Sequence, residues 1–142
     1  MFYLILKLFM ETIQENKELL KDLCARLPYG VICNTPKGDG RLCSINQTIF
    51  GTEYGINIKA TERDYFNDKE VDIKPYLRPM SSMTEEELAQ YKCMNDALDE
   101  NYEVHIDNAY PAFDWLNEHY FDYRGLIEKN LALDCTGLHI YD

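Results

Sequence analysis

The hydrophobic pattern of the chain changes period at Pro28 and Gly30. Before this point, apolar residues recur at helical spacing and share one helical face: Ile13, Leu20, Leu23, Cys24 and Leu27. After it, short runs with alternating or β-branched residues are typical of half-buried strands. Because a proline followed by a glycine ends a helix, the sequence predicts one helix and then a β-rich region, as in an α+β domain.

The β-rich middle contains two runs joined by a glycine-rich turn. Residues 29–35 and 41–50 are predicted to be strands, and residues 36–40 (PKGDG) to form the turn of a β-hairpin. Further short strands are expected from alternation or β-branched content at 54–59, 71–74 and 102–107. The turn lacks the Gly-x-x-x-x-Gly-Lys-Ser/Thr pattern, so a phosphate-binding loop is not expected there.

Two more helices are expected in the second part of the chain. Thr84 and Glu87 form a capping box, in which each side chain satisfies a free N–H group of the other residue. A third helix is expected to open at 108–111 and to end at 122–125. The residues expected on its buried side are Phe113, Leu116 and Tyr120. The fold class predicted for residues 1–142 is a single α+β domain, mostly antiparallel sheet with about three helices.

Residues 1–9 (MFYLILKLF) form the most apolar segment. No basic region precedes the apolar run, Lys7 interrupts it, and it is shorter than the ~20 residues of a spanning helix. Neither a leader peptide nor a membrane span is therefore expected. Three interpretations remain open: an added β-strand, an apolar face that continues the first helix, or an extension upstream of an alternative start at Met10.

One part of the chain carries the net charge of −11. Residues 1–84 contain equal numbers of acidic and basic side chains, whereas residues 85–142 contain 14 Asp and Glu but only three Lys and Arg. A surface of that sign repels phosphate backbones and anionic lipids, so direct binding to nucleic acid or to a membrane is not expected. The expected partner is a protein with a basic surface, and mimicry of nucleic acid by carboxylates is a special case.

The five cysteines are odd in number and include no Cys-x-x-Cys pair. Their spacing fits neither a zinc ribbon nor a disulfide framework, so we expect reduced cysteines and a cytoplasmic protein. Three of them lie in apolar runs and are expected to be buried: Cys24, Cys33 and Cys43.

Four segments carry a family resemblance: 23–31 (LCARLPYGV), 44–55 (SINQTIFGTEYG), 74–87 (KPYLRPMSSMTEEE) and 114–126 (DWLNEHYFDYRGL). Together they resemble a family of small proteins from Bacteroidales genomes and from the phages and mobile elements of these bacteria. The resemblance covers most of residues 19–133. It implies a bacterial or phage cytoplasmic setting, and it implies no catalytic residue because the family has no established activity.

The sharpest chemical pattern in the chain joins Glu103, His105 and Asp107. In a strand, the period of two places these three side chains on one face, where they could bind a divalent metal or position a general base. A solvated strand face produces the same pattern, and we expect that explanation to hold, with no metal, no cofactor and no catalytic residue. A small metal-assisted enzyme centred on these residues is the alternative function. A small-ligand-binding module with a tyrosine-lined pocket is a further alternative.

Aromatic residues are concentrated in the acidic part of the chain. Trp115 is expected at the border of a helix face and Tyr123 just beyond the helix end, each partly exposed. Rings within a rim of carboxylates are typical of protein-binding surfaces. The predicted binding residues are Trp115 and Tyr123, with Asp114, Glu118, Asp122, Glu100 and Glu103 around them. The expected function is thus that of a small acidic, non-catalytic accessory protein that binds a basic protein or a second copy of itself.

Overall fold

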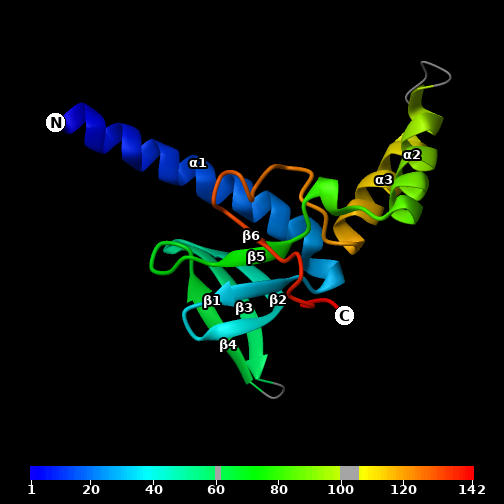
Figure 1. The fold of residues 1–142 in the computed structure, drawn as a ribbon. Helices are drawn as coiled ribbons and strands as arrows, with labels where there is room; N and C mark the ends of the chain where they lie inside the picture. Colours follow the sequence, from blue (N-terminus) through cyan, green and yellow to red (C-terminus); the bar gives the residue numbers. More distant parts are fainter. Residues whose placement is uncertain (60–61, 100–105) are drawn as a thin grey trace.

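Helix α1 and a six-stranded sheet form the two main layers of the protein (Figure 1). The computed structural model describes residues 1–59, 62–99 and 106–142. In chain order, its elements are α1 (Phe2–Arg26), η1 (Leu27–Tyr29), β1 (Ile32–Thr35), β2 (Gly38–Thr48), β3 (Gly51–Lys59), β4 (Glu62–Asn67), β5 (Lys74–Leu77), η2 (Met80–Ser82), α2 (Glu85–Asp99), α3 (Ile106–Glu118) and β6 (Leu133–Asp134). The strand order is β4-β3-β2-β1-β5-β6, and only the pair β5 and β6 is parallel. The predicted α+β domain with a mostly antiparallel sheet is confirmed.

The first helix ends where the sequence predicts. Its α-helical part stops at Arg26, and η1 leads into Gly30, whose φ of 62° is the left-handed conformation that glycine adopts easily. A Cβ atom at this position would lie only 2.4 Å from the side chain of Arg41. The backbone conformation therefore favours glycine, whereas the nearest atom belongs to the flexible end of the exposed Arg41 side chain, which can move away.

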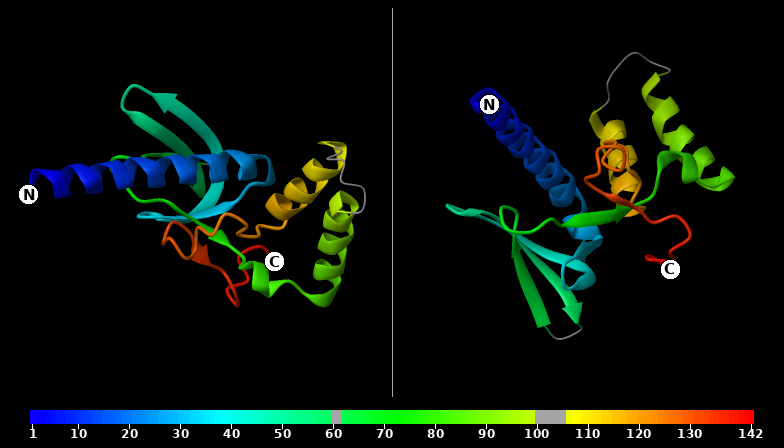
Figure 2. Two further views of the ribbon diagram at one scale, coloured as in Figure 1. Left: turned by 90° about the horizontal axis from the view of Figure 1, so that it is seen from above. Right: turned by 60° about the vertical axis from the view of Figure 1, so that its left-hand side comes forward.

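Residues 1–9 belong to α1, so the continuation of the first helix is the interpretation that the structure supports. This part of α1 extends beyond the sheet, and residues 1–15 are all exposed (Figures 1 and 2). Leu19 and Leu23, further along the same helix, are buried in the core. Cys24 is exposed, and the prediction that it is buried is wrong because it lies beside the inward face of α1 rather than on it.

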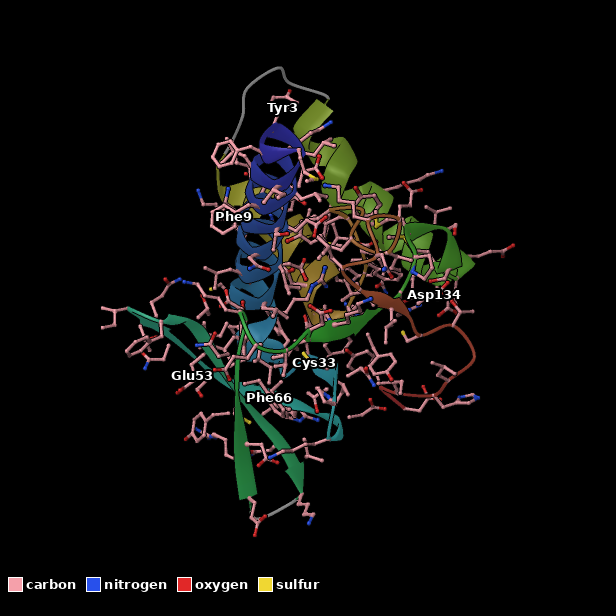
Figure 3. All side chains as sticks on the ribbon, turned by 90° about the vertical axis from the view of Figure 1, so that its left-hand side faces the viewer. Tyr3, Phe9, Cys33, Glu53, Phe66 and Asp134 are labelled. Atoms are coloured by element: carbon pink, nitrogen blue, oxygen red, sulfur yellow. The ribbon has the colours of Figure 1, made fainter. Side chains whose placement is uncertain are left out.

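The core lies between the second half of α1 and one face of the sheet. Its buried members are Leu19, Leu23, Val31, Cys33, Leu42, Tyr54, Ile56, Phe66, Ile73, Leu77, Leu126 and Ala132. Cys33 is buried as predicted, and Cys43 is half-buried. Figure 3 shows Cys33 and Phe66 in the sheet, well separated from Tyr3 and Phe9 on α1.

The predicted hairpin is confirmed, with a tighter turn. Thr35 pairs with Gly38, so only residues 36 and 37 form the turn, and the glycines expected in the turn begin β2 instead. The strand expected at 54–59 is confirmed and begins earlier, at residue 51.

Two other strands differ from the prediction. The strand expected at 71–74 lies at Lys74–Leu77, because residue 73 enters the core before the chain pairs with β1. Strand β4 was missing from the prediction because its sequence, ERDYFN, is mostly polar and most of its residues are not buried. Strand β4 has this composition because it forms an edge of the sheet.

The capping box at the start of α2 is confirmed. The backbone N–H of Thr84 donates to Oε1 of Glu87 at 3.0 Å, and the N–H of Glu87 donates to Oγ1 of Thr84 at 3.1 Å. The prediction for the following segment is wrong at residues 106 and 107, which belong to α3 rather than to a strand. Residues 102–105 of that expected strand lie outside the described residues.

Helix α3 ends at Glu118, before the predicted end at 122–125. The chain reverses at Tyr120, which has a φ of 63° although it is not glycine. Its ring stacks on Tyr141 with centroids 3.6 Å apart, and its hydroxyl donates to the carbonyl of Tyr29 at 2.5 Å. These two contacts offset the strain of the left-handed conformation.

The C-terminal segment returns along the sheet. Strand β6 pairs with β5, and Tyr141 lies against the neighbouring strand. The Tyr141 hydroxyl accepts from the N–H of Ile32 at 3.0 Å and donates to the carbonyl of Tyr76 at 2.7 Å. Helices α2 and α3 lie side by side at the end of the molecule opposite Met1 (Figure 2).

Candidate protein-interaction surface

The turn after α3 brings Tyr123 back beside Phe113. After the reversal at Tyr120, Phe121 forms a parallel bridge with Arg78, which follows β5. The ring centroids of Phe113 and Tyr123 then lie 5.6 Å apart at an angle of 58°. Aromatic rings attract one another at this distance and tilt.

Phe113 is the more exposed member of this pair, with 51% of its surface accessible, while Tyr123 is half-buried. The hydroxyl of Tyr123 donates to Oδ1 of the buried Asn117 at 3.0 Å, which fixes the tyrosine ring. The two rings therefore present an exposed apolar centre that is held in place before any partner binds.

Two exposed carboxylates lie on the same helix as Phe113. Asp114 and Glu118 lie one helical turn apart on α3. Burial and then the charges of these two carboxylates raise the pKa of the Tyr29 phenol, which shows that both lie near η1. We call Phe113, Asp114, Glu118 and Tyr123 the α3 patch.

The prediction that Phe113 is buried is wrong. The inner face of α3 is formed by Ala112, Leu116 and Asn117, which are all buried. The prediction that Leu116 is buried is therefore correct. Tyr120, the third, lies beyond the helix end and is half-buried.

Trp115 is half-buried, as predicted, but its stacking partners are not those of the α3 patch. The centroid of its ring lies 4.4 Å from His119, 5.6 Å from Phe121 and 6.3 Å from Tyr91 of α2. Along α3, Trp115 lies about 200° around the axis from Phe113. Its ring therefore packs α2 against α3.

Asp122 is buried, so the prediction that it borders an exposed patch is wrong. Its carboxylate accepts from the backbone N–H of Leu126 at 2.8 Å and of Ile127 at 2.9 Å. It thereby satisfies the polar groups of the turn that follows. The nearby Arg124 lies 3.4 Å from the buried carboxylate of Asp22.

The remaining predicted site residues are not placed together by the structure. Glu100, Glu103 and His105 lie outside the described residues, and Asp107 lies in α3, where only its backbone is described. The strand alternation that would align the triad therefore does not extend to residue 107. Among the side chains that the structure describes, in residues 1–59, 62–94 and 111–142, no three His, Cys, Asp or Glu gather as metal ligands would.

A hollow of about 490 Å³ near the C-terminal segment contains tyrosines, as a small-ligand pocket would. The hydroxyls of Tyr120 and Tyr141 there are bound to the backbone carbonyls of Tyr29 and Tyr76. Cys135 also lines the hollow, and burial raises the pKa of its thiol, which keeps it protonated. The hydroxyls of these two tyrosines are thus occupied by backbone contacts that hold the fold. Arg78, Glu87, His119 and His139 also line the hollow.

Sequence reasoning missed the roles of Phe113 and Asn117. The spacing of four between Ala112 and Leu116 marks the true inner face, and Asn117 next to it could have been assigned to that face. No signal in the sequence shows that Asn117 orients Tyr123, because that contact depends on the reversal at Tyr120.

In the part of the chain that the structure describes, none of the helices has both the length and the apolarity to cross a bilayer. The chain matches no protein-family model, no curated protein and no solved structure. The function must therefore be inferred from the chemistry of the surface.

Proposed function

We propose that the protein is a small, acidic, non-catalytic interaction protein that binds a basic protein partner through the α3 patch. The observation that carries this proposal is the exposed ring of Phe113, which Tyr123 supports at 5.6 Å. A rigid, exposed aromatic side chain is typical of the residues that dominate binding energy at protein interfaces. Phe113 replaces Trp115 as the centre of the surface, because the Trp115 ring packs between helices.

The charge around the α3 patch favours a basic partner. Asp114 and Glu118 are exposed on α3, and Glu85 and Glu86 are exposed in the first turn of α2. Arg124, whose guanidinium lies 5.2 Å from the centroid of the Tyr123 ring, offsets part of this negative charge. Such a surface attracts lysine and arginine side chains and repels phosphate groups. An arginine of the partner could also stack on the exposed face of Phe113, where a cation–π contact adds about 0.5–1 kcal/mol.

The resemblance of the sequence to small proteins of Bacteroidales and their phages supports a bacterial or phage cytoplasm as the setting of this activity. An accessory protein of a phage or mobile element would use the α3 patch to bind a host protein. Where that host protein has a basic DNA-binding groove, the carboxylates of α2 and α3 would occupy phosphate-like positions and block it.

The proposal is tested with a partner that is captured, purified and then measured. The wild-type protein, immobilised through its C-terminus, captures proteins from a Bacteroidales lysate, and each captured protein is titrated against purified variants by calorimetry. We expect Phe113→Ala to weaken binding at least tenfold, and Asp114→Lys with Glu118→Lys to slow association. The association rate should also fall as salt rises, because the Debye length is about 10 Å at 0.1 M.

Matched controls separate the α3 patch from general surface effects. Leu138→Ala removes an apolar side chain that is 54% exposed, close to the 51% of Phe113, but lies outside the α3 patch. Glu128→Lys reverses an exposed charge elsewhere in the acidic part. Both controls should bind as the wild type does. Equal losses in the control and test variants, or binding that is insensitive to Phe113→Ala, would refute the proposal.

A further inference from the structure

The first half of α1 exposes an unusually large apolar surface. The exposed large apolar side chains there are Met1, Phe2, Tyr3, Leu4, Ile5, Leu6, Leu8, Phe9, Met10 and Ile13. Applying their exposed fractions to side chains of ordinary size gives on the order of 1,000 Å², whereas the largest apolar patch on a typical monomer is about 300–600 Å². A surface of this size needs an occupant.

Part of this surface forms a regular stripe along the helix. Residues at alternating spacings of four and three share one face: Phe2, Leu6, Phe9, Ile13, Asn16, Leu20, Leu23 and Leu27. This is the spacing of a helix that packs against another helix. The sheet covers this face in the second half of α1, where Leu23 is fully buried. It does not cover residues 2, 6, 9 and 13, which we call the uncovered stripe.

A groove of about 740 Å³ lies beside Phe9 and Ile13, the last two residues of the uncovered stripe. Phe9, Ile13 and Leu19 of α1 form one wall. The opposite wall includes Val71, Ile73 and Leu131, from the segment before β5 and from the C-terminal segment. Leu19 and Ile73 also belong to the core, so the groove borders the core, and its lining also includes charged side chains such as Asp68, Glu70 and Lys129. A second apolar helix laid along α1 would fill it.

We propose that residues 2–13 of α1 form the interface of a two-fold symmetric homodimer. The uncovered stripes of two copies pack antiparallel, and the first turns of each helix enter the groove of the other copy. This interface is isologous, so the same side chains serve on both sides and the assembly closes at two copies. It is distinct from the α3 patch, which remains free for a different partner.

The antiparallel orientation follows from what covers the second half of α1. In a parallel pair, the second halves of the two α1 helices would lie side by side. The sheets that cover these halves would then lie between the two helices and hold them apart. In an antiparallel pair, the two sheets lie at opposite ends of the overlap and do not meet. The helix dipoles also oppose one another in this arrangement, which is favourable.

Area and charge are both consistent with a second copy as the occupant. Covering half to two-thirds of the apolar surface would bury roughly 500–700 Å² per copy, close to the ~800 Å² of a standard interface. Residues 1–13 carry one basic and one acidic side chain, Lys7 and Glu11, and the groove is lined by four acidic and three basic side chains. The charge of −11 is therefore not concentrated at this interface and does not oppose contact there. The acidic helices α2 and α3 lie at the other end of each copy, away from this interface (Figure 2).

Light scattering coupled to size exclusion tests the proposal. The wild type should elute at twice the monomer mass of 16.7 kDa. Phe9→Glu should raise the dimer dissociation constant at least a hundredfold, because it places a charge in the uncovered stripe. Leu8→Glu is the matched control: Leu8 and Phe9 are neighbours and each is 63% exposed, but Leu8 lies outside the stripe. The control should remain a dimer, and both variants should keep the wild-type circular dichroism.

Three results would overturn the proposal. The first is a wild-type protein that stays monomeric at concentrations on the order of 100 μM. The second is equal loss of dimer in Phe9→Glu and Leu8→Glu, which would indicate unspecific apolar association. The third is a monomer that floats with phosphatidylcholine and phosphatidylglycerol vesicles and loses flotation equally in both variants, which would assign α1 to a lipid surface.

A separate measurement tests the orientation. Phe2→Cys is introduced into a protein in which the accessible Cys24, Cys43 and Cys93 are replaced by serine. In the antiparallel dimer, the two copies of residue 2 are far apart, so mild oxidation should give little cross-linked product. Efficient cross-linking through residue 2 would show a parallel pair and overturn the proposed arrangement.

Discussion

The guanidinium of Arg26 donates through Nη2 to the backbone carbonyl of Phe121 at 2.7 Å, across 95 residues of chain. Arg26 also donates through Nε to Oδ2 of Asp22 at 2.9 Å, and both side chains are fully buried. This contact ties the end of α1 to the segment that carries Tyr123. It therefore fixes the position of the α3 patch relative to α1.

Replacing Arg26 by methionine should destabilise the protein by about 3–5 kcal/mol, because Asp22 would remain buried without its main partner. Burial already raises the pKa of Asp22, against the opposing influence of Arg26. Urea unfolding at neutral pH measures the loss. The double variant Asp22→Leu with Arg26→Met should recover part of it, since no buried charge remains. A double variant that is less stable than Arg26→Met would contradict this explanation.

The ion pair between Arg78 and Glu87 should make stability depend on pH in the acid range. Two hydrogen bonds of 2.8 and 2.7 Å from Arg78 hold the pKa of Glu87 at about 2, below its ordinary value of 4.5. A carboxylate with a depressed pKa stabilises the fold above about pH 4.5, and this contribution disappears as the pH falls toward 2. Glu87→Gln should therefore cost about 1–2 kcal/mol at pH 7 and almost nothing near pH 2.

Urea unfolding of Glu87→Gln and wild type at several pH values measures this difference. Glu86→Gln is the control, because Glu86 is an exposed neighbour with the same chemistry. Its difference from the wild type should stay small. A constant difference for Glu87→Gln across the whole range would show that the ion pair does not carry the effect.

Trp115 and Phe113 should respond differently to truncation. Trp115→Ala should cost about 2–3 kcal/mol, because the ring is half-buried in the stack with Tyr91, His119 and Phe121. Phe113→Ala should cost under about 1 kcal/mol, because half of its ring is exposed. Chemical denaturation of the two variants measures both values. The reverse order of stability would mean that Phe113, not Trp115, holds the helices together.

The cysteines should differ sharply in reactivity. Cys24 and Cys93 are exposed, whereas Cys33 is buried and its pKa is strongly raised, mainly by burial. Since the thiolate is the reactive form, iodoacetamide should modify Cys24 and Cys93 in the native protein and leave Cys33 unmodified. Peptide mass spectrometry identifies the modified positions, and labelling in denaturant provides the control. Early modification of Cys33 would show that the core opens more readily than its packing indicates.

Local signals in the sequence predicted the parts of the fold that local chemistry determines. The end of α1 at Gly30 and the capping box of Thr84 and Glu87 depend on neighbours within a few residues. The end of α3 depends instead on Tyr141 and Tyr29, which hold Tyr120 in a left-handed conformation. The residues next to Tyr120 in the sequence do not show these distant contacts, so the sequence predicts that the helix continues.

The same distinction applies to the candidate site. The exposure of Asp114 and Glu118 could be predicted from helical spacing and charge. The burial of Asp122 could not, because its carboxylate is occupied by the N–H groups of a turn formed only after α3 ends. Helical spacing groups Phe113 with Leu116 on the inner face, and the surface that Phe113 occupies instead exists only once Tyr123 returns beside it.

The hydrogen bonds of Tyr141 have a consequence for synthesis of the protein on the ribosome. The N–H of Ile32 is satisfied by a hydroxyl that lies 109 residues later, and β6 covers the outer edge of β5 only near residue 133. During translation, the outer edge of β5 therefore stays unpaired until almost the whole chain has emerged. A nascent chain with an unpaired edge and an apolar first helix is a ready target for holding chaperones, so we expect trigger-factor-type binding to persist until late in translation.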